Sequence, residues 1–140
     1  MARLIPDDFD LSAVEPSERR VLEALLASLG PGWLLLPQVP LVDRGQDGEA
    51  DLVALNAEHG AVVFEVKGGT ISVRDGAWYQ DGRRLAKSPA EQAVRAKHAL
   101  VRKVREVTGN EHGGGLWFTH AVAFPDAAAT PTQWLGPDLE

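Results

Sequence analysis

Four charged residues interrupt the apolar stretch GEADLVALNAEHGAVVFEVKGG, which spans residues 48–69. Glu49 and Asp51 stand at the start of its first apolar run, and Glu65 and Lys67 lie near the end of its second. Carboxylate oxygens are the ligands that Mg²⁺ and Mn²⁺ prefer. Whether these residues do metal chemistry depends on whether the fold brings them to one point.

A β-hairpin would bring them together. The two apolar runs flank NAEHG, a connection with turn chemistry. If the runs pair antiparallel about its middle, Asp51 faces Glu65 and Glu49 faces Lys67. Because side chains alternate between the two faces of a strand, all four charges then share one face. The other face of the second strand carries core residues, which are Val62, Phe64 and Val66.

Two carboxylates that face each other across a hairpin repel. Facing Cβ atoms lie about 5 Å apart, and unit charges at that separation repel by roughly 3 kcal/mol at an effective dielectric constant of about 20. Either one acid is protonated, or a cation lies between Asp51 and Glu65. An exposed strand face with ordinary cross-strand ion pairs, such as Glu49 with Lys67, explains the pattern equally well. Hairpin geometry alone therefore leaves both a metal site and a plain charged surface open.

Two helices must help to position the hairpin. The sequence predicts one helix from Pro16 to Gly30 and a second from Ser88 to a stop at Gly109. The residues predicted for the core face are Leu22, Leu25, Leu26 and Leu29 on the first helix and Val94, Leu100, Val101, Val104 and Val107 on the second.

The remaining segments are shorter. WLLLPQVPLV (33–42) carries two prolines, which confine it to a sheet edge or a connector, and RGQDG (44–48) reads as a polar loop. Asp75-Gly76 and Asp81-Gly82 predict tight turns between short strands. LWFTHAVAF (116–124) predicts a buried strand.

The order of these elements, α-β-β-β-α-β, indicates a mixed α/β fold with a central mixed sheet flanked by helices. A chain of 140 residues suits one compact domain. We expect an irregular N-terminal arm over residues 1–15, the domain over residues 16–126, and a C-terminal tail over residues 127–140 that could link to a missing domain.

Composition narrows the class of protein. The chain has no cysteine, which excludes disulfides and thiolate metal ligands. No apolar run approaches the roughly 18 residues of a membrane span, and the N-terminus does not resemble a signal peptide. We therefore expect a cytoplasmic protein without membrane association.

The charge is unevenly distributed. The net charge is −6, yet residues 74–105 hold nine basic residues and three acids, a local net of +6. The rest of the chain, with five basic residues and seventeen acids, has a net of −12. A basic patch on an acidic protein could face phosphates, although a solvated basic helix is the plainer interpretation.

The spacing of the charged residues resembles a known pattern. An acid at a strand start, followed fourteen residues later by Glu-X-Lys, is typical of the PD-(D/E)XK nuclease superfamily, and Asp51 with Glu65-Val66-Lys67 is similar. Ala50 stands where that pattern has a proline, a residue that carries no chemistry. From about Ser17 to Asp126 the chain more closely resembles the nuclease-related domain (NERD). The segments that carry this resemblance are GEADLVAL, VVFEVKGG, DGAWYQDGRRLAKSPAEQAVRAKHAL and AVAFPD.

The resemblance implies a restriction-endonuclease-like core and cleavage of nucleic acid that depends on Mg²⁺ or Mn²⁺. Asp51 and Glu65 match the metal-binding acids, and the carbonyl of Val66 often joins the coordination in such sites. Lys67 matches the lysine that positions water and stabilises charge on the phosphate, a role that suits a compact ammonium group.

Two helical residues complete the candidate catalytic set. Glu18 shares a helix line with Leu22, and in related nucleases an acid from the first helix approaches the metal. A glutamate favoured by the helix dipole is the alternative interpretation. Gln92 resembles the helix glutamine of the superfamily's exonuclease-like branch, and a solvated amide is the alternative there.

Basic residues around the second helix are candidate phosphate contacts, which would give salt-dependent and sequence-independent binding. They are Arg95, Arg102 and Lys103 on one helix face, with Arg83, Arg84 and Lys87 before the helix. Trp78 and Tyr79 could stack on bases. A core position for one ring and a sheet-surface position for the other is the alternative.

These inferences predict a metal-dependent nuclease domain that acts on DNA. NERD modules often accompany helicase domains, so the resemblance implies part of a DNA-processing protein such as a helicase fusion. RNA as the substrate fits the sequence equally well. The alternative function is a non-catalytic module that keeps this fold, binds nucleic acid or a partner domain, and cleaves nothing.

Overall fold

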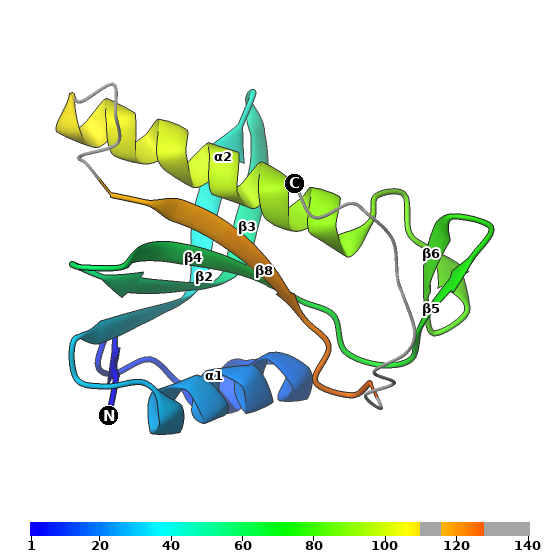
Figure 1. The fold of residues 1–140 in the computed structure, drawn as a ribbon, viewed down its shortest axis with the longest axis horizontal. Helices are drawn as coiled ribbons and strands as arrows, with labels where there is room; N and C mark the ends of the chain where they lie inside the picture. Colours follow the sequence, from blue (N-terminus) through cyan, green and yellow to red (C-terminus); the bar gives the residue numbers. More distant parts are fainter. Residues whose placement is uncertain (110–115, 128–140) are drawn as a thin grey trace.

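The chain folds into one mixed five-stranded sheet with a helix on each face and a small three-stranded sheet at one end (Figure 1). This computed structural model describes residues 1–109 and 116–127, so most of the expected C-terminal tail (127–140) lies outside the described residues. The elements are β1 (Arg3–Leu4), a 3-10 turn (Leu11–Ala13), α1 (Pro16–Ser28), β2 (Trp33–Asp43), β3 (Gln46–Asn56), β4 (Gly60–Val66), β5 (Ile71–Arg74), β6 (Ala77–Gln80), β7 (Arg83–Arg84), α2 (Pro89–Thr108) and β8 (Phe118–Ala123).

The large sheet has the strand order β1-β2-β3-β4-β8. β2, β3 and β4 form an antiparallel meander, while β1 and β8 add in parallel at the two edges. The order α1-β2-β3-β4-α2-β8 confirms the predicted mixed α/β class and is consistent with a restriction-endonuclease-like core. None of the helices within the described ranges is long and apolar enough to cross a membrane.

Both helices begin and end close to the predicted residues. Ser88 caps α2 by accepting a hydrogen bond from the amide of Glu91 at 3.1 Å, and Gly109 ends the helix in the left-handed conformation with φ of 68°. α1 starts with Pro16 in its first turn and ends at Ser28, two residues before the predicted stop at Gly30.

The two helices pack through different side chains. Leucines of α1 pack on one sheet face, as predicted, together with Leu52 and Phe64. The prediction for α2 was wrong in part. Its buried positions include Ala90, Ala93 and Ala99, whereas Val107 is 79% exposed. Leu100, one of the predicted core residues, does pack against the core cluster. The periodicity of the bulky residues did not reveal the small alanines, which let the helix axis lie close to the sheet.

The segment 33–48 was predicted as a broken strand followed by a loop, and it forms a long hairpin instead. β2 and β3 pair in one register from Trp33–Asn56 to Asp43–Gln46, interrupted only at Gln38 and Asp51, and they are joined by the two-residue turn Arg44-Gly45. Both turn residues have positive φ, 50° and 78°, as at Asp75-Gly76 and Asp81-Gly82, where the predicted turns are confirmed. Arginine is an unusual first residue for such a turn, which is why the sequence suggested a loop.

The edges of the sheet differ from the expectations as well. Within the N-terminal arm, Arg3 and Leu4 pair with β2, and Ala2 and Val14 are buried, so the arm is not irregular. β1 covers two residues of β2, and the rest of β2 past Leu35 stays at the edge, where its prolines are tolerated. β8 was predicted to be buried, but it is a half-buried edge strand.

Candidate active site

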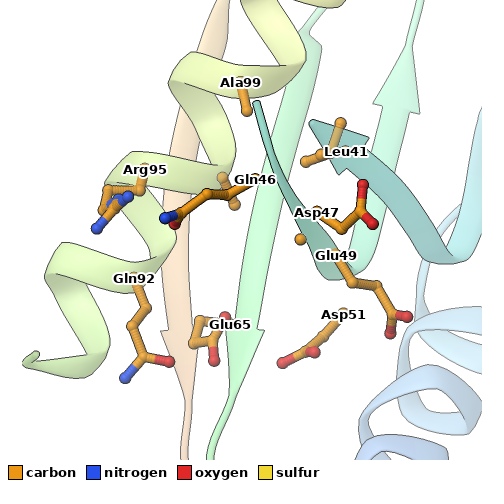
Figure 2. Close-up of a pocket in the computed structure, with 11 residues that line it drawn as sticks. Leu41, Gln46, Asp47, Glu49, Asp51, Glu65, Gln92, Arg95 and Ala99 are labelled. Atoms are coloured by element: carbon orange, nitrogen blue, oxygen red, sulfur yellow. The ribbon is translucent and has the colours of Figure 1, made fainter. Parts of the chain in front are cut away.

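Asp51 on β3 and Glu65 on β4 are brought together where the two strands separate. The register predicted for the hairpin is confirmed from Leu52–Phe64 to Asn56–Gly60, and the ladder ends there. In Figure 2 the Asp51 carboxylate points toward Glu65, while the Glu49 carboxylate points away from it. The predicted convergence therefore holds for the two acids and fails for Glu49.

Asp51 lies where the side-chain alternation of the sheet shifts by one position. Leu52 packs in the cluster beneath α1, but Ala50, two residues away, packs in the cluster beneath α2. Residues two apart share a face in a regular strand. Gln38 lies opposite Asp51 on β2 and has φ of 51°. The hydrogen-bonded ladder between β2 and β3 omits the pair Gln38–Asp51. The shift explains why Glu49 and Asp51 do not share a face.

A hydrogen bond fixes the Asp51 side chain. Its Oδ2 accepts a hydrogen bond from the backbone amide of Val66 at 2.8 Å. The carboxylate thus replaces the backbone carbonyl that a neighbouring strand would offer to this amide of β4. The contact ties the acid to the residue between Glu65 and Lys67. Asp51 is thereby held beside the Glu-X-Lys segment by the backbone itself.

Lys67 pairs with Glu65 on its own strand. Its Nζ lies 3.2 Å from Oε1 of Glu65, and the two side chains are 15% and 11% exposed. The predicted cross-strand pair of Lys67 with Glu49 is wrong, because β3 and β4 have already separated at this level. Asp51, Glu65 and the amine of Lys67 form one compact, largely desolvated group.

Three acids at this place have raised pKa values. Burial, with Asp51 nearby, raises the pKa of Glu65 to about 7 against the opposing effect of Lys67. Burial also raises the pKa of Asp51, opposed by the Val66 amide and by Lys67. The pKa of Glu18 rises to about 7, first through burial and then through Asp51, Glu15 and Glu49, while a hydrogen bond with Gln38 opposes the change. Burial is thus the main cause for all three acids, and repulsion from neighbouring carboxylates adds to it.

Glu18 reaches this group because the start of α1 lies against the end of β4. A Cβ on Gly68 would come within 2.6 Å of the Ser17 side chain, so the contact requires glycine. Asp126 strengthens the junction, since it accepts from the Gly69 amide at 2.7 Å and pairs with Arg20. Sequence reasoning assigned no role to Ser17, Gly68 or Asp126. The Gly-Gly pair after Lys67 was the available signal for a close approach.

Two hollows share Asp51 and Glu65 as part of their walls. One, of about 230 Å³, lies between the β2–β3 hairpin and α2 and includes Gln92 and Arg95 (Figure 2). The other, of about 590 Å³, lies between the first turn of α1 and the end of β4 and includes Glu18 and Lys67. The two acids therefore face open space on both sides.

The structure brings Gln92 to the first of these hollows. Its Nε2 also donates to the carbonyl of Lys87 at 3.1 Å, which fixes the amide near the start of α2. Glu18 and Gln92 thus flank the acid pair from opposite helices. Both lie near it, as the resemblance implied, and neither position by itself assigns a chemical role.

The predicted basic residues separate into three groups. Arg83, Arg84 and Lys87 are exposed before α2, and Arg95 lines the small hollow of Figure 2. Arg102 and Lys103 lie further along α2, beside the tip of the β2–β3 hairpin. The stripe is therefore interrupted rather than continuous.

The two aromatic candidates are already engaged within the fold. Trp78 stacks on Phe124 with ring centroids 6.0 Å apart, and Arg74 lies 4.3 Å over the ring of Tyr79. Both residues are half-buried on β6. These contacts favour a structural role for the rings over stacking on bases.

The donor atoms suit a hard divalent cation. Asp51 and Glu65 supply carboxylate oxygens, and their raised pKa values indicate a place where a positive charge would be stabilised. Within residues 1–109 and 116–127, however, no group of three or more His, Cys, Asp or Glu side chains is arranged to hold a metal ion. The protein thus offers two close acids, with further ligands to come from the backbone, water or a bound phosphate.

Comparison with known proteins agrees with this geometry. The profile of the nuclease-related domain matches residues 13–125, which include both helices, the acid pair and Lys67. No curated protein and no solved structure matches the chain. Because the matched region spans well over half of the sequence, the chain belongs to the nuclease-related domain (NERD) family.

Proposed function

We propose that this domain hydrolyses phosphodiester bonds in DNA with the help of Mg²⁺ or Mn²⁺. The observation that carries the proposal is the desolvated group of Asp51, Glu65 and Lys67, open to hollows on both sides. Membership in a nuclease-related family supports the same reaction. RNA offers the same phosphodiester chemistry and is a second substrate to test.

Asp51, Glu65 and the carbonyl of Val66 are the proposed metal ligands. A divalent ion held there supplies a Lewis acid for the phosphate and lowers the pKa of bound water. The hydrogen bond from the Val66 amide keeps Asp51 in place, so one carboxylate oxygen orients the residue and the other remains for binding.

Lys67 is proposed to hold a non-bridging phosphate oxygen. Its amine is a compact charge next to Glu65, and Lys67 also lines the larger hollow, where a phosphate would bind. Negative charge grows on the phosphate in the transition state, so a fixed ammonium group stabilises that state more than the ground state.

Glu18 and Gln92 are proposed to act on either side of the reacting phosphate. With a pKa raised to about 7 by burial and nearby acids, Glu18 can accept or hold a proton near neutral pH. Gln92 and Arg95 line the smaller hollow and can orient the polynucleotide by hydrogen bonding and charge. Arg83, Arg84 and Lys87 are proposed as further backbone contacts. A helicase, fused or associated, is a proposed partner.

Two observations favour the alternative, a non-catalytic module that binds nucleic acid or a partner. The described residues contain no three-acid metal cluster, and Lys67 is paired with one of the two acids that would bind metal. Such a protein would bind DNA through its basic residues without cleaving it.

Cleavage of plasmid and single-stranded DNA, each with Mg²⁺ and with Mn²⁺, distinguishes the two functions. We expect Asp51→Ala and Lys67→Ala to lose at least about a hundredfold in rate, as for loss of a key electrostatic group. Asp7→Ala and Arg3→Ala, exposed residues of the N-terminal arm, are matched controls and should keep full activity. Equal activity in all variants would reject the site. DNA binding by a wild-type protein that cleaves nothing would establish the non-catalytic module. A parallel assay on single-stranded RNA tests the second substrate.

A further inference from the structure

A third hollow lies at the far end of α2, beside the tip of the β2–β3 hairpin. It has a volume of about 440 Å³. Three of its lining residues are cations, Arg44 on the hairpin turn and Arg102 and Lys103 on α2. Glu106 is the acid in the lining, so the described cations outnumber the acid by three to one.

The length of the hairpin places Arg44 there. β2 and β3 stay paired as far as Asp43–Gln46, and their tip projects past α2 (Figure 1). The positive φ angles of Arg44 and Gly45 close the hairpin in two residues. Nζ of Lys103 donates to the carbonyl of Pro40 at 3.3 Å, which ties the helix to the hairpin just below the tip. Cations distant in the sequence therefore meet at one place.

The hollow continues the seam between α2 and the hairpin that begins at the acid pair. Both elements also line the smaller hollow beside Asp51 and Glu65, where Arg95 is the cation that α2 contributes. Arg95 and Arg102 are seven residues apart, close to two helical turns and about 10 Å along the axis. They lie on the same side of α2, as their shared seam requires.

Both hollows beside the acid pair are acidic, unlike the third hollow. The smaller one is lined by Asp47, Glu49, Asp51 and Glu65 against Arg95. The larger hollow near α1 is lined by six acids against two bases. Those acids are Glu15, Glu18, Asp51, Glu65, Asp81 and Asp126, and the bases are Arg20 and Lys67. Of these three hollows, the third is therefore the one whose charge favours a phosphate.

We infer that Arg44, Arg102 and Lys103 form a second phosphate-binding subsite, which holds the DNA backbone a few nucleotides away from the acid pair. The inference rests on the proposed function, whose substrate it places along the seam beside α2. The rise of about 10 Å from Arg95 to Arg102 corresponds to roughly three base-pair steps of about 3.4 Å along B-form DNA. Arg44 is the member of this subsite that the helix pattern does not reveal.

Arg44→Asn tests the subsite with little risk to the fold. Asn-Gly is a preferred sequence for a two-residue hairpin turn, so this variant removes the charge and keeps the turn. Arg3→Asn is the matched control, because it removes an exposed arginine from the other end of the sheet. Lys103→Gln is the second subsite variant.

Affinity of the 140-residue chain for a fluorescent 20-base-pair DNA duplex is measured from about 50 to 200 mM KCl, without divalent metal. We expect Arg44→Asn and Lys103→Gln each to weaken binding about three- to tenfold at the middle of this range. Each should lower the slope of log K against log salt by about 1, the contribution of one phosphate contact. Arg3→Asn should bind like the wild type.

The outcomes separate the subsite from the proposed reaction. If Arg44→Asn and Lys103→Gln keep the wild-type affinity and salt slope, or if the wild type does not bind the duplex, the subsite is rejected. If both variants bind more weakly and the wild type cleaves no DNA with Mg²⁺ or Mn²⁺, the subsite stands and the proposed hydrolysis fails. A wild type that cleaves DNA while Arg44→Asn binds normally leaves the reaction standing without this subsite.

Discussion

The two helices flank the same pair of acids but differ in packing and in charge. α1 packs on the sheet with leucines, and its first turn surrounds the acid pair with further carboxylates. α2 packs with alanines, and the seam along it carries arginine and lysine. The charges around the start of α1 therefore suit a cation, and those at the far end of α2 suit a phosphate. The proposed metal ligands and the proposed phosphate contacts would thus come from separate parts of the fold.

Removing a leucine from α1 should have the largest effect on stability. Leu22 is 2% exposed and contributes to the core beneath α1. Leu22→Ala leaves a cavity, and we expect it to lower the free energy of unfolding by about 2–5 kcal/mol. Urea denaturation followed by circular dichroism measures the change. Val107→Ala, at a largely exposed position of α2, should stay within about 0.5 kcal/mol of the wild type. A loss below about 1 kcal/mol in Leu22→Ala would contradict the packing described for α1.

The opposite substitution should damage α2. Ala93 is fully buried against the sheet, so Ala93→Leu overpacks the contact and should cost about 1–3 kcal/mol. Val107→Leu is the matched control and should be neutral, because Val107 is largely exposed. The same denaturation experiment measures both variants. If Val107→Leu were the more damaging of the two, the valine face first predicted from the sequence would be the true core face.

The pH dependence of stability tests the acid-rich side. The pKa values of Glu18 and Glu65 rise from about 4.5 to about 7 on folding, mainly through burial. The folded protein therefore binds more protons than the unfolded chain between these values. Their contribution to stability is complete below about pH 4.5 and is lost as the pH rises through about 7. Without metal, Tm should fall between pH 6 and pH 8, and Mg²⁺ should raise Tm more at pH 8 than at pH 6.

Glu18→Gln gives that experiment its control. The variant cannot ionise, so its Tm should fall less than that of the wild type between pH 6 and pH 8. Glu23→Gln changes an exposed glutamate of the same helix and should follow the wild-type profile. Identical profiles for Glu18→Gln and the wild type would show that Glu18 does not share the electrostatic environment of Asp51.

The smallest expected effect concerns the ion pair at the start of α1. Arg20 pairs with Asp126, but its side chain is 56% exposed, and exposed pairs contribute about 1 kcal/mol or less. Arg20→Ala should therefore lower Tm by at most a few degrees, and the difference should shrink at high salt. Arg19→Ala on the same helix is the control. A large loss in Arg20→Ala would mean that the junction of α1 with β4 depends on charge rather than on the close contact at Gly68.

Much of the fold could be predicted because local signals agreed with it. Ser88, Pro89 and Gly109 mark the ends of α2, and two Asp-Gly pairs mark turns of the small sheet. The hairpin register followed from the Asn56–Gly60 connection. Arg44-Gly45 was missed because a tight turn with arginine depends on the pairing of its flanking strands rather than on turn propensity.

The site was predictable in its centre and less so at its margins. Asp51, Glu65 and Lys67 could be placed together because period-two alternation holds between β3 and β4 up to Leu52. Glu49 could not be placed, since the alternation shifts at Asp51 and no sequence rule signals that shift. Ser17 and Asp126 were missed because their contacts join segments far apart in the chain.

The shift at Gln38 and Asp51 has a consequence for how this family can vary. Beyond it, β2 and β3 are held by their own pairing, and Asp51 is held separately by the Val66 amide. Adding or deleting one residue on each strand near the tip would thus change how far the β2–β3 hairpin extends, without moving the acids. Such a change would alter the distance between the proposed phosphate subsite at the hairpin tip and the acid pair, while the acid pair keeps its place.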